Sequence, residues 1–98
     1  MDVVQLKKGL YDAQKQRDTL RVSVLRFLLS AISNREIELR GEGKTLSDED
    51  VFKVIKKQIK QRGESIDGFK AVGRPQNAAR EEEEKKILEE LLGSTPQS

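Results

Sequence analysis

The sequence predicts an all-α protein, an elongated antiparallel four-helix bundle. Apolar residues recur with helical spacing, and no stretch shows the strict apolar–polar alternation that is typical of a half-buried strand. Capping residues and glycines divide the chain into four segments with short connections, which favours antiparallel neighbours. The helices are expected at approximately residues 3–17, 19–40, 48–72 and 75–92.

The first two segments each begin after an aspartate. Asp2 and Gln5 have the spacing of a capping box, and Asp18 is a candidate N-cap for residues 19–40. In that second segment, apolar residues cover more than half of the helix circumference, so it is expected to be the central helix, with Phe27 buried. Past Ile32 the apolar pattern fades, which predicts that the end of this helix projects beyond the core.

Glycines and caps also divide the second half of the chain. Gly41 is expected to take the left-handed position that ends a helix, and Ser47 with Asp50 has the spacing of an N-terminal cap. Gly73 is expected to end the third segment, and Pro75 suits the first turn of the next. The third segment has an apolar inner face, formed by Val51, Val54, Ile55, Ile59, Ile66, Phe69 and Val72.

The composition restricts the chemistry that the chain can perform. Its 98 residues suffice for one domain, expected at residues 1–93 and followed by a disordered tail at residues 94–98. The chain has no Cys and no His, so it lacks a thiol nucleophile, the commonest general base and the commonest metal ligand. We therefore predict no catalytic residue, no metal and no cofactor.

The expected setting is cytoplasmic, with no membrane partner. No apolar run approaches the roughly 20 residues needed to cross a bilayer, and the N-terminus lacks the order of a signal peptide. Charge is distributed unevenly: the first 62 residues carry 14 Lys and Arg against 9 Asp and Glu, whereas residues 63–98 carry 5 against 8. This asymmetry indicates either complementary helix faces or a front half that binds a polyanion.

Lysines form a stripe on the third segment, within about 100° of one another on a helical wheel and opposite its apolar face. They are Lys53, Lys56, Lys57 and Lys60. Such a stripe either faces solvent or contacts phosphate. No aromatic residue interleaves with it, which argues against a stacking platform for single-stranded nucleic acid.

Polar side chains also interrupt two faces that are expected to be apolar. On the third segment they are Gln58, Arg62 and Ser65. On the second segment they are Arg26, Ser30 and Asn34. If the two sets face each other, they form a polar layer between helices or one wall of a groove, in which Glu36 or Glu38 supplies opposing charge. The acidic run at residues 81–84 is interpreted as a solvated helix side.

Four blocks resemble the GatB/YqeY family. They are RVSVLRFLLSAISNREIE at residues 21–38, SDEDV at 47–51, IKKQIKQRGESIDGFKAVGR at 55–74 and EEEEKKILEELL at 81–92. The resemblance implies an all-helical domain. Its members are small stand-alone proteins or the tail of the B subunit of glutamine-dependent amidotransferases, where the tail helps to hold tRNA. It also implies a smaller C-terminal helical subdomain, which has no counterpart in these 98 residues.

The resemblance implies a non-catalytic tRNA-binding or adaptor module, with tRNA or a protein as partner. It associates the chain with carbon–nitrogen ligase activity that uses glutamine as amido donor, although no spacing suggests an activated nucleophile. The alternative is a protein–protein interaction module without a nucleic-acid role. The residues that the resemblance suggests as a binding surface are Arg26, Asn34, Lys60, Arg62 and Arg74.

Overall fold

The fold consists entirely of helices over the part of the chain that the structure, a computed structural model, describes, residues 2–93. The helices are α1 (Val3–Lys15), α2 (Thr19–Gly41), α3 (Asp48–Ala71) and α4 (Pro75–Gly93). This confirms the predicted all-α four-helix architecture: each helix begins at the expected residue and ends within two residues of it. The predicted disordered tail at residues 94–98 lies outside the described residues.

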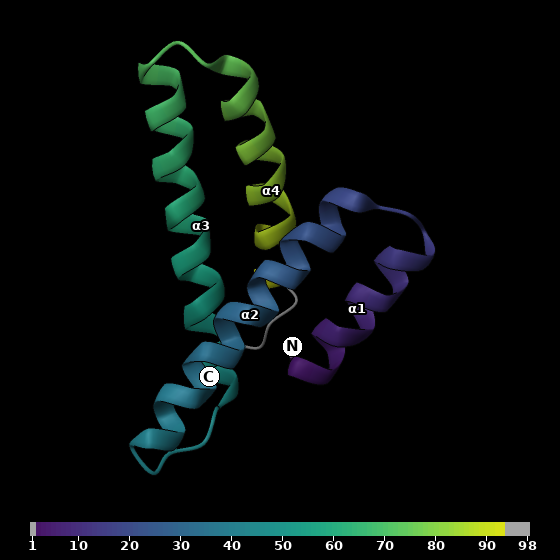
Figure 1. The fold of residues 1–98 in the computed structure, drawn as a ribbon, viewed down its shortest axis with the longest axis vertical. Coiled ribbons are helices and arrows are strands. Elements are labelled where there is room, and N and C mark those ends of the chain that lie inside the picture. Colours follow the sequence, from purple (N-terminus) through teal and green to yellow (C-terminus); the bar gives the residue numbers. More distant parts are fainter. Residues whose placement is uncertain (1, 94–98) are drawn as a thin grey trace.

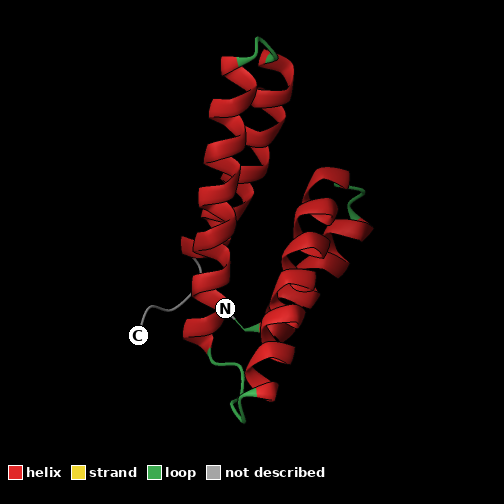
Figure 2. Cartoon of the chain, turned by 60° about the vertical axis from the view of Figure 1, so that its left-hand side comes forward, coloured by secondary structure: helices red, strands yellow, loops and turns green. Residues whose placement is uncertain are grey.

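Consecutive helices pair into two antiparallel hairpins, α1 with α2 and α3 with α4 (Figure 1). Figure 2 shows that the hairpins approach each other near the α2–α3 loop and diverge toward their opposite ends. The α3–α4 turn therefore lies at the far end of the molecule from the α2–α3 loop. The resulting shape is elongated, with principal extents of 45 × 31 × 22 Å. None of the described helices has both the length and the apolar character needed to span a membrane.

The helix starts follow the predicted caps. Asp2 and Gln5 form a reciprocal capping box before α1, and Ser47 and Asp50 form another before α3. Each box satisfies backbone N–H groups that have no acceptor within the first helical turn. Asp18 caps α2 by accepting a hydrogen bond from the Arg21 backbone N–H at 3.1 Å.

The helix ends required two corrections. Gly41 was expected in the left-handed position, but it is the last residue of α2, and Gly43 takes that position with φ of 72°. Because the turn is made at Gly43, the Lys44 N–H donates to the Leu39 carbonyl at 2.8 Å, which closes the helix end. The first helix ends at Lys15 rather than residue 17, because Arg17 itself is left-handed, with φ of 58°. Gly73 ends α3 as predicted.

One apolar cluster joins all four helices. It comprises Leu6, Ala13, Val24, Leu25, Leu28, Ile32, Val51, Ile55, Ile87, Leu88 and Leu91. Because every helix contributes to it, the two hairpins are held together by shared burial of apolar surface. Helix α2 packs against α1 within its own hairpin and also against the α3–α4 hairpin, as expected for the central helix.

Three predictions of burial were wrong. Phe27 is 57% exposed and Val72 is 68% exposed, although both were expected to be buried. Val72 follows the last residue of α3 as its C-cap, and Phe27 lines hollows at the surface of α2. Conversely, Leu39 is only 4% exposed, although the end of α2 was expected to project from the core.

Candidate functional site

Arg62 is at the centre of a cluster that joins three helices. Its Nε lies 3.1 Å from Glu81 Oε2 and its Nη1 lies 3.6 Å from Glu84 Oε2, both on α4. Its guanidinium carbon lies 5.7 Å from the centre of the Phe27 ring on α2. The Arg62, Glu81 and Glu84 side chains are 24%, 19% and 15% exposed. Arg62 is therefore an interhelical ion-pair residue in the described structure.

The acidic run is not uniformly solvated, contrary to the prediction. Glu81 and Glu84 are three residues apart, so they share one face of α4, and that face is turned toward Arg62. Glu82 is exposed and pairs with Lys70 at 3.1 Å, and Glu83 is exposed. This i, i+3 spacing opposite an arginine on an apolar helix face was the signal that could have identified the cluster.

Burial raises the pKa of the Glu81 carboxyl group above its usual range. Arg62 acts against this shift, and the neighbouring Glu84 adds to it. Arg62 Nε and Glu81 Oε2 are close, but they are buried and neither forms a hydrogen bond. Attraction to Arg62 therefore offsets only part of the effect of burial on the pKa of this carboxyl group.

The two polar sets do not face each other. The α2 set, Arg26, Ser30 and Asn34, is exposed. The α3 set lies inside: Gln58 is only 5% exposed, and Arg62 and Ser65 are partly buried. The acids expected to oppose them pair elsewhere, Glu36 with Arg40 at 3.7 Å and Glu38 with Arg35 at 3.0 Å.

The lysines of the third segment, Lys53, Lys56, Lys57 and Lys60, are all exposed on the outward face of α3 and are called the lysine row below. Lys53 lies 3.4 Å from Glu49, and Lys56 lies 5.4 Å from the centre of the Phe52 ring. Further along the same face, Glu64 and Asp67 are exposed, so the basic surface is confined to the first half of α3.

Arg74 does not join the lysine row. It is exposed in the α3–α4 turn, fourteen residues beyond Lys60, which corresponds to roughly 20 Å along a helix axis. Its backbone N–H donates to the Phe69 carbonyl at 2.8 Å, completing the end of α3. The structure thus separates Arg74 from the other residues predicted to contact nucleic acid.

A groove of about 400 Å³ runs between α2 and α3 beside the lysine row. Its apolar lining is Phe27, Ala31 and Val54. Its charged lining is Arg35, Glu38, Asp50, Lys53 and Lys57. Gln58 also lines this α2–α3 groove and an adjoining cavity of about 100 Å³ that reaches Arg62 and Glu84. The side-chain amide of Gln58 forms no hydrogen bond with any described residue.

A second, broader hollow of about 770 Å³ lies on the exposed side of α2. It is lined by Val22, Arg26, Phe27 and Ser30, together with polar residues around the α1–α2 turn. Phe27 therefore stands between this hollow and the α2–α3 groove. The sequence-based reasoning missed Phe27 and Arg35; the i, i+4, i+8 spacing of Phe27, Ala31 and Arg35 could have placed them on one edge of α2.

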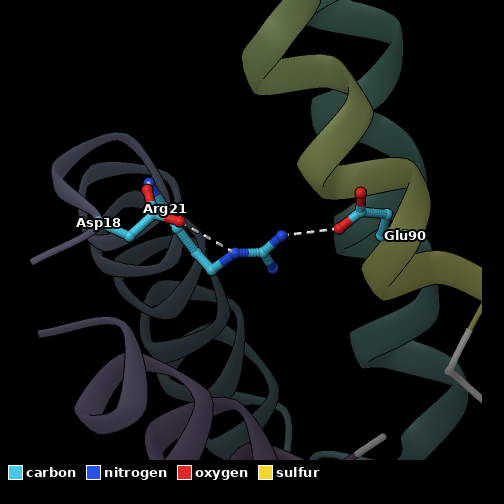
Figure 3. A network of polar contacts seen from close by, with 3 residues as sticks. All are labelled: Asp18, Arg21 and Glu90. Carbon is cyan, nitrogen blue, oxygen red and sulfur yellow. Dashed lines mark hydrogen bonds and ion pairs between the residues drawn. The ribbon is translucent and has the colours of Figure 1, made fainter. Parts of the chain in front are cut away.

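An ion pair also links the two hairpins outside these surfaces. Figure 3 shows Arg21 of α2 reaching Glu90 of α4, with Nη2 and Oε2 2.7 Å apart. Asp18 lies beside the same guanidinium, with its Oδ2 3.6 Å from Nε. Arg21 is about one-third exposed, so this pair adds orientation more than stability.

Comparison with known proteins shows the family to which the chain belongs. The family model of Yqey-like proteins matches residues 3–97, and the chain belongs to that family. Among curated relatives, "Altered inheritance of mitochondria protein 41, mitochondrial" of Lachancea thermotolerans is 38% identical over 94 residues, covering 96% of this chain and 49% of the relative. The protein of the same name from Saccharomyces cerevisiae strain S288c is 33% identical over 93 residues, covering 95% and 49%.

These relatives are longer than this chain, and they bear on its expected setting. The chain spans about half the length of the relatives it matches, 49% and 50% for those of Lachancea thermotolerans and Vanderwaltozyma polyspora. The expected cytoplasmic setting is contradicted, because the names of these relatives describe mitochondrial proteins. Composition alone does not identify the compartment in which a protein resides.

Proposed function

We propose that this chain is a non-catalytic helical module that binds RNA, with tRNA as the expected ligand, through the lysine row of α3. The observation that supports this proposal is the exposure of all four lysines on one outward face, beside a groove. The resemblance to the tail of tRNA-dependent amidotransferases adds support for tRNA as the ligand class. The glutamine-dependent chemistry of those enzymes belongs to other domains and is not proposed for this chain.

The lysine row is best suited to contact phosphate groups. Lys53 to Lys60 span about 10 Å along α3, so their ammonium groups can contact successive backbone phosphates and release bound counterions. Lys57 and Lys60 form no ion pair with any described residue. The pair between Lys53 and Glu49 is exposed and therefore weak, so it does not prevent Lys53 from engaging phosphate.

The test measures tRNA binding by fluorescence anisotropy between about 50 and 200 mM salt. Replacing the four lysines of the row by Gln is expected to weaken binding and to lower the slope of log affinity against log salt by about 3, since each phosphate contact contributes roughly 0.7 to 0.9. The matched control replaces four exposed lysines elsewhere, Lys7, Lys8, Lys15 and Lys44, by Gln and has the same net charge.

The control separates a specific surface from general attraction. If both quadruple variants lose the same affinity and slope, the lysine row is not the binding surface. Absence of tRNA binding by the unmodified chain at about 50 mM salt would refute the proposal as a whole.

A protein-binding function is the second candidate, supported by the exposed Phe27 and the partly buried Val22 in the hollow on α2. Exposed apolar hollows with polar rims are common at protein interfaces. This candidate predicts a partner that co-purifies with the chain after nuclease treatment. Its recovery must fall with Phe27→Ala and remain unchanged when the lysine row is replaced by Gln; the reverse pattern would refute this candidate.

A further inference from the structure

We propose that the α2–α3 groove accepts a single unstacked nucleotide: Phe27 stacks on the base, the Gln58 amide pairs with the base edge, and Lys57 with Arg35 holds the phosphate. This inference rests on the proposed function for its ligand class. It concerns a different set of contacts, however, and has a readout that does not require tRNA.

Phe27 provides the stacking surface. It is more than half exposed, and it lines the α2–α3 groove and both adjoining hollows. The Arg62 guanidinium lies over its ring and is itself held by Glu81 and Glu84, so the ring is supported from behind. An exposed aromatic ring fixed in this way is the feature that proteins use to stack unpaired bases. The sequence predicted that Phe27 is buried and that no aromatic residue interleaves with the lysines; the exposure of Phe27 makes an aromatic ring available beside them.

Gln58 provides the polar group at the floor of the groove. It is 5% exposed, and its amide has no hydrogen-bond partner among the described residues. Its amide atoms are not among the buried atoms that lack a partner, so they are accessible from the groove and can pair with a ligand there. An amide offers a donor and an acceptor side by side, which matches the adjacent acceptor and donor on the edge of a base.

Lys57 and Arg35 provide positive charge at the mouth of the groove. Lys57 lines the groove and is not ion-paired with another described residue. Arg35 pairs with Glu38, but both side chains are exposed, so a phosphate can compete for the guanidinium. The groove volume of about 400 Å³ is within the range of small-molecule pockets.

A planar ring with a polar edge and an anionic tail fits this arrangement better than a peptide does. The apolar lining is limited to Phe27, Ala31 and Val54, which is a short patch rather than the long strip that an amphipathic partner helix requires. The Gln58 amide and the cations lie beside that patch, where they can contact the edge of a base and its phosphate. An acidic peptide is therefore the alternative that the experiment must separate.

The experiment is an NMR titration of the full chain with AMP, GMP, CMP and UMP, followed through the side-chain amide of Gln58 and the ring of Phe27. At least one mononucleotide is expected to shift both signals saturably. Phe27→Leu and Gln58→Leu are each expected to weaken that binding by at least about 10-fold. Phe52→Leu and Gln76→Leu, which change the same residue types outside the groove, should leave it unchanged.

Three results would overturn the nucleotide pocket. They are the absence of any saturable shift, equal shifts with inorganic phosphate alone, and shifts with an acidic peptide but not with mononucleotides. Because the Leu variants could perturb folding, the unmodified chain decides each of these. If mononucleotides fail while tRNA still binds through the lysine row, only this inference falls. If mononucleotides bind in the groove but tRNA does not bind, the proposed function falls and the pocket stands.

Discussion

Glu81 is a side chain whose ionisation destabilises the folded chain. Its carboxyl group is partly buried near Glu84, and its contact with Arg62 lacks a hydrogen bond. Burial raises the pKa of Glu81, so the folded chain binds this proton more tightly than the unfolded chain does. By linkage, the proton on Glu81 stabilises the folded chain. This stabilisation is fully present below the ordinary pKa of 4.5 and is lost as the pH rises through the raised pKa.

Glu81→Gln is expected to remove this pH dependence, because Gln cannot ionise. The free energy of unfolding of the variant, relative to the unmodified chain, should therefore rise between about pH 4 and pH 7. Urea unfolding followed by circular dichroism over that pH range measures it. Glu83→Gln is the matched control, since Glu83 is an exposed neighbour in the same run. A pH-independent difference for Glu81→Gln would show that its pKa is not raised.

The ends of the helices show how closely local chemistry determines an element. Gly41 is helical with open space where a Cβ would be, so Gly41→Ala is expected to stabilise the chain by up to about 1 kcal/mol. Gly43, two residues later, has φ of 72°, so Gly43→Ala is expected to cost about 1 to 2 kcal/mol. Thermal and urea unfolding of the two variants should give changes of opposite sign; changes of the same sign would contradict this assignment of the helix end.

The helix starts were predictable from the sequence because an N-cap is a local arrangement. Ser47 and Asp50 satisfy each other's backbone N–H groups within one turn, whatever the rest of the chain does. The end of α2 was harder to predict, since two glycines, Gly41 and Gly43, are equally able to adopt the left-handed conformation. Arg17 was not predictable at all from residue preference, because few residues other than glycine take that conformation.

At the scale of the whole molecule, few buried side chains stabilise the half of the α3–α4 hairpin that is farther from the α2–α3 loop. Between residues 64 and 80, only Ile66 and Ala78 are buried, and neither belongs to the shared apolar cluster. We expect backbone amides in this region to exchange through local opening, at lower free energy than those near Ile55 or Leu88. Native-state hydrogen exchange at low denaturant measures this difference. Uniform protection along α3 would contradict it.

The candidate site depended on how the hairpins sit relative to each other, and periodicity does not contain that information. The helical wheel correctly placed Gln58 and Arg62 on the inner side of α3, because the angle between residues is fixed by helix geometry. It could not show that Phe27 is uncovered, since this depends on how the other helices pack against α2. The groove is a property of the assembled hairpins rather than of either helix.

The pairing of consecutive helices also has a kinetic consequence. Each hairpin brings together residues that are near in sequence, so its formation closes only a short loop and costs little chain entropy. Chains with such local topology generally fold within microseconds to milliseconds. The two hairpins can thus form early, and their docking is the slower event that closes the common core. The α2–α3 groove comes into existence only at that last step, so occupancy of the groove would selectively slow unfolding of the docked chain.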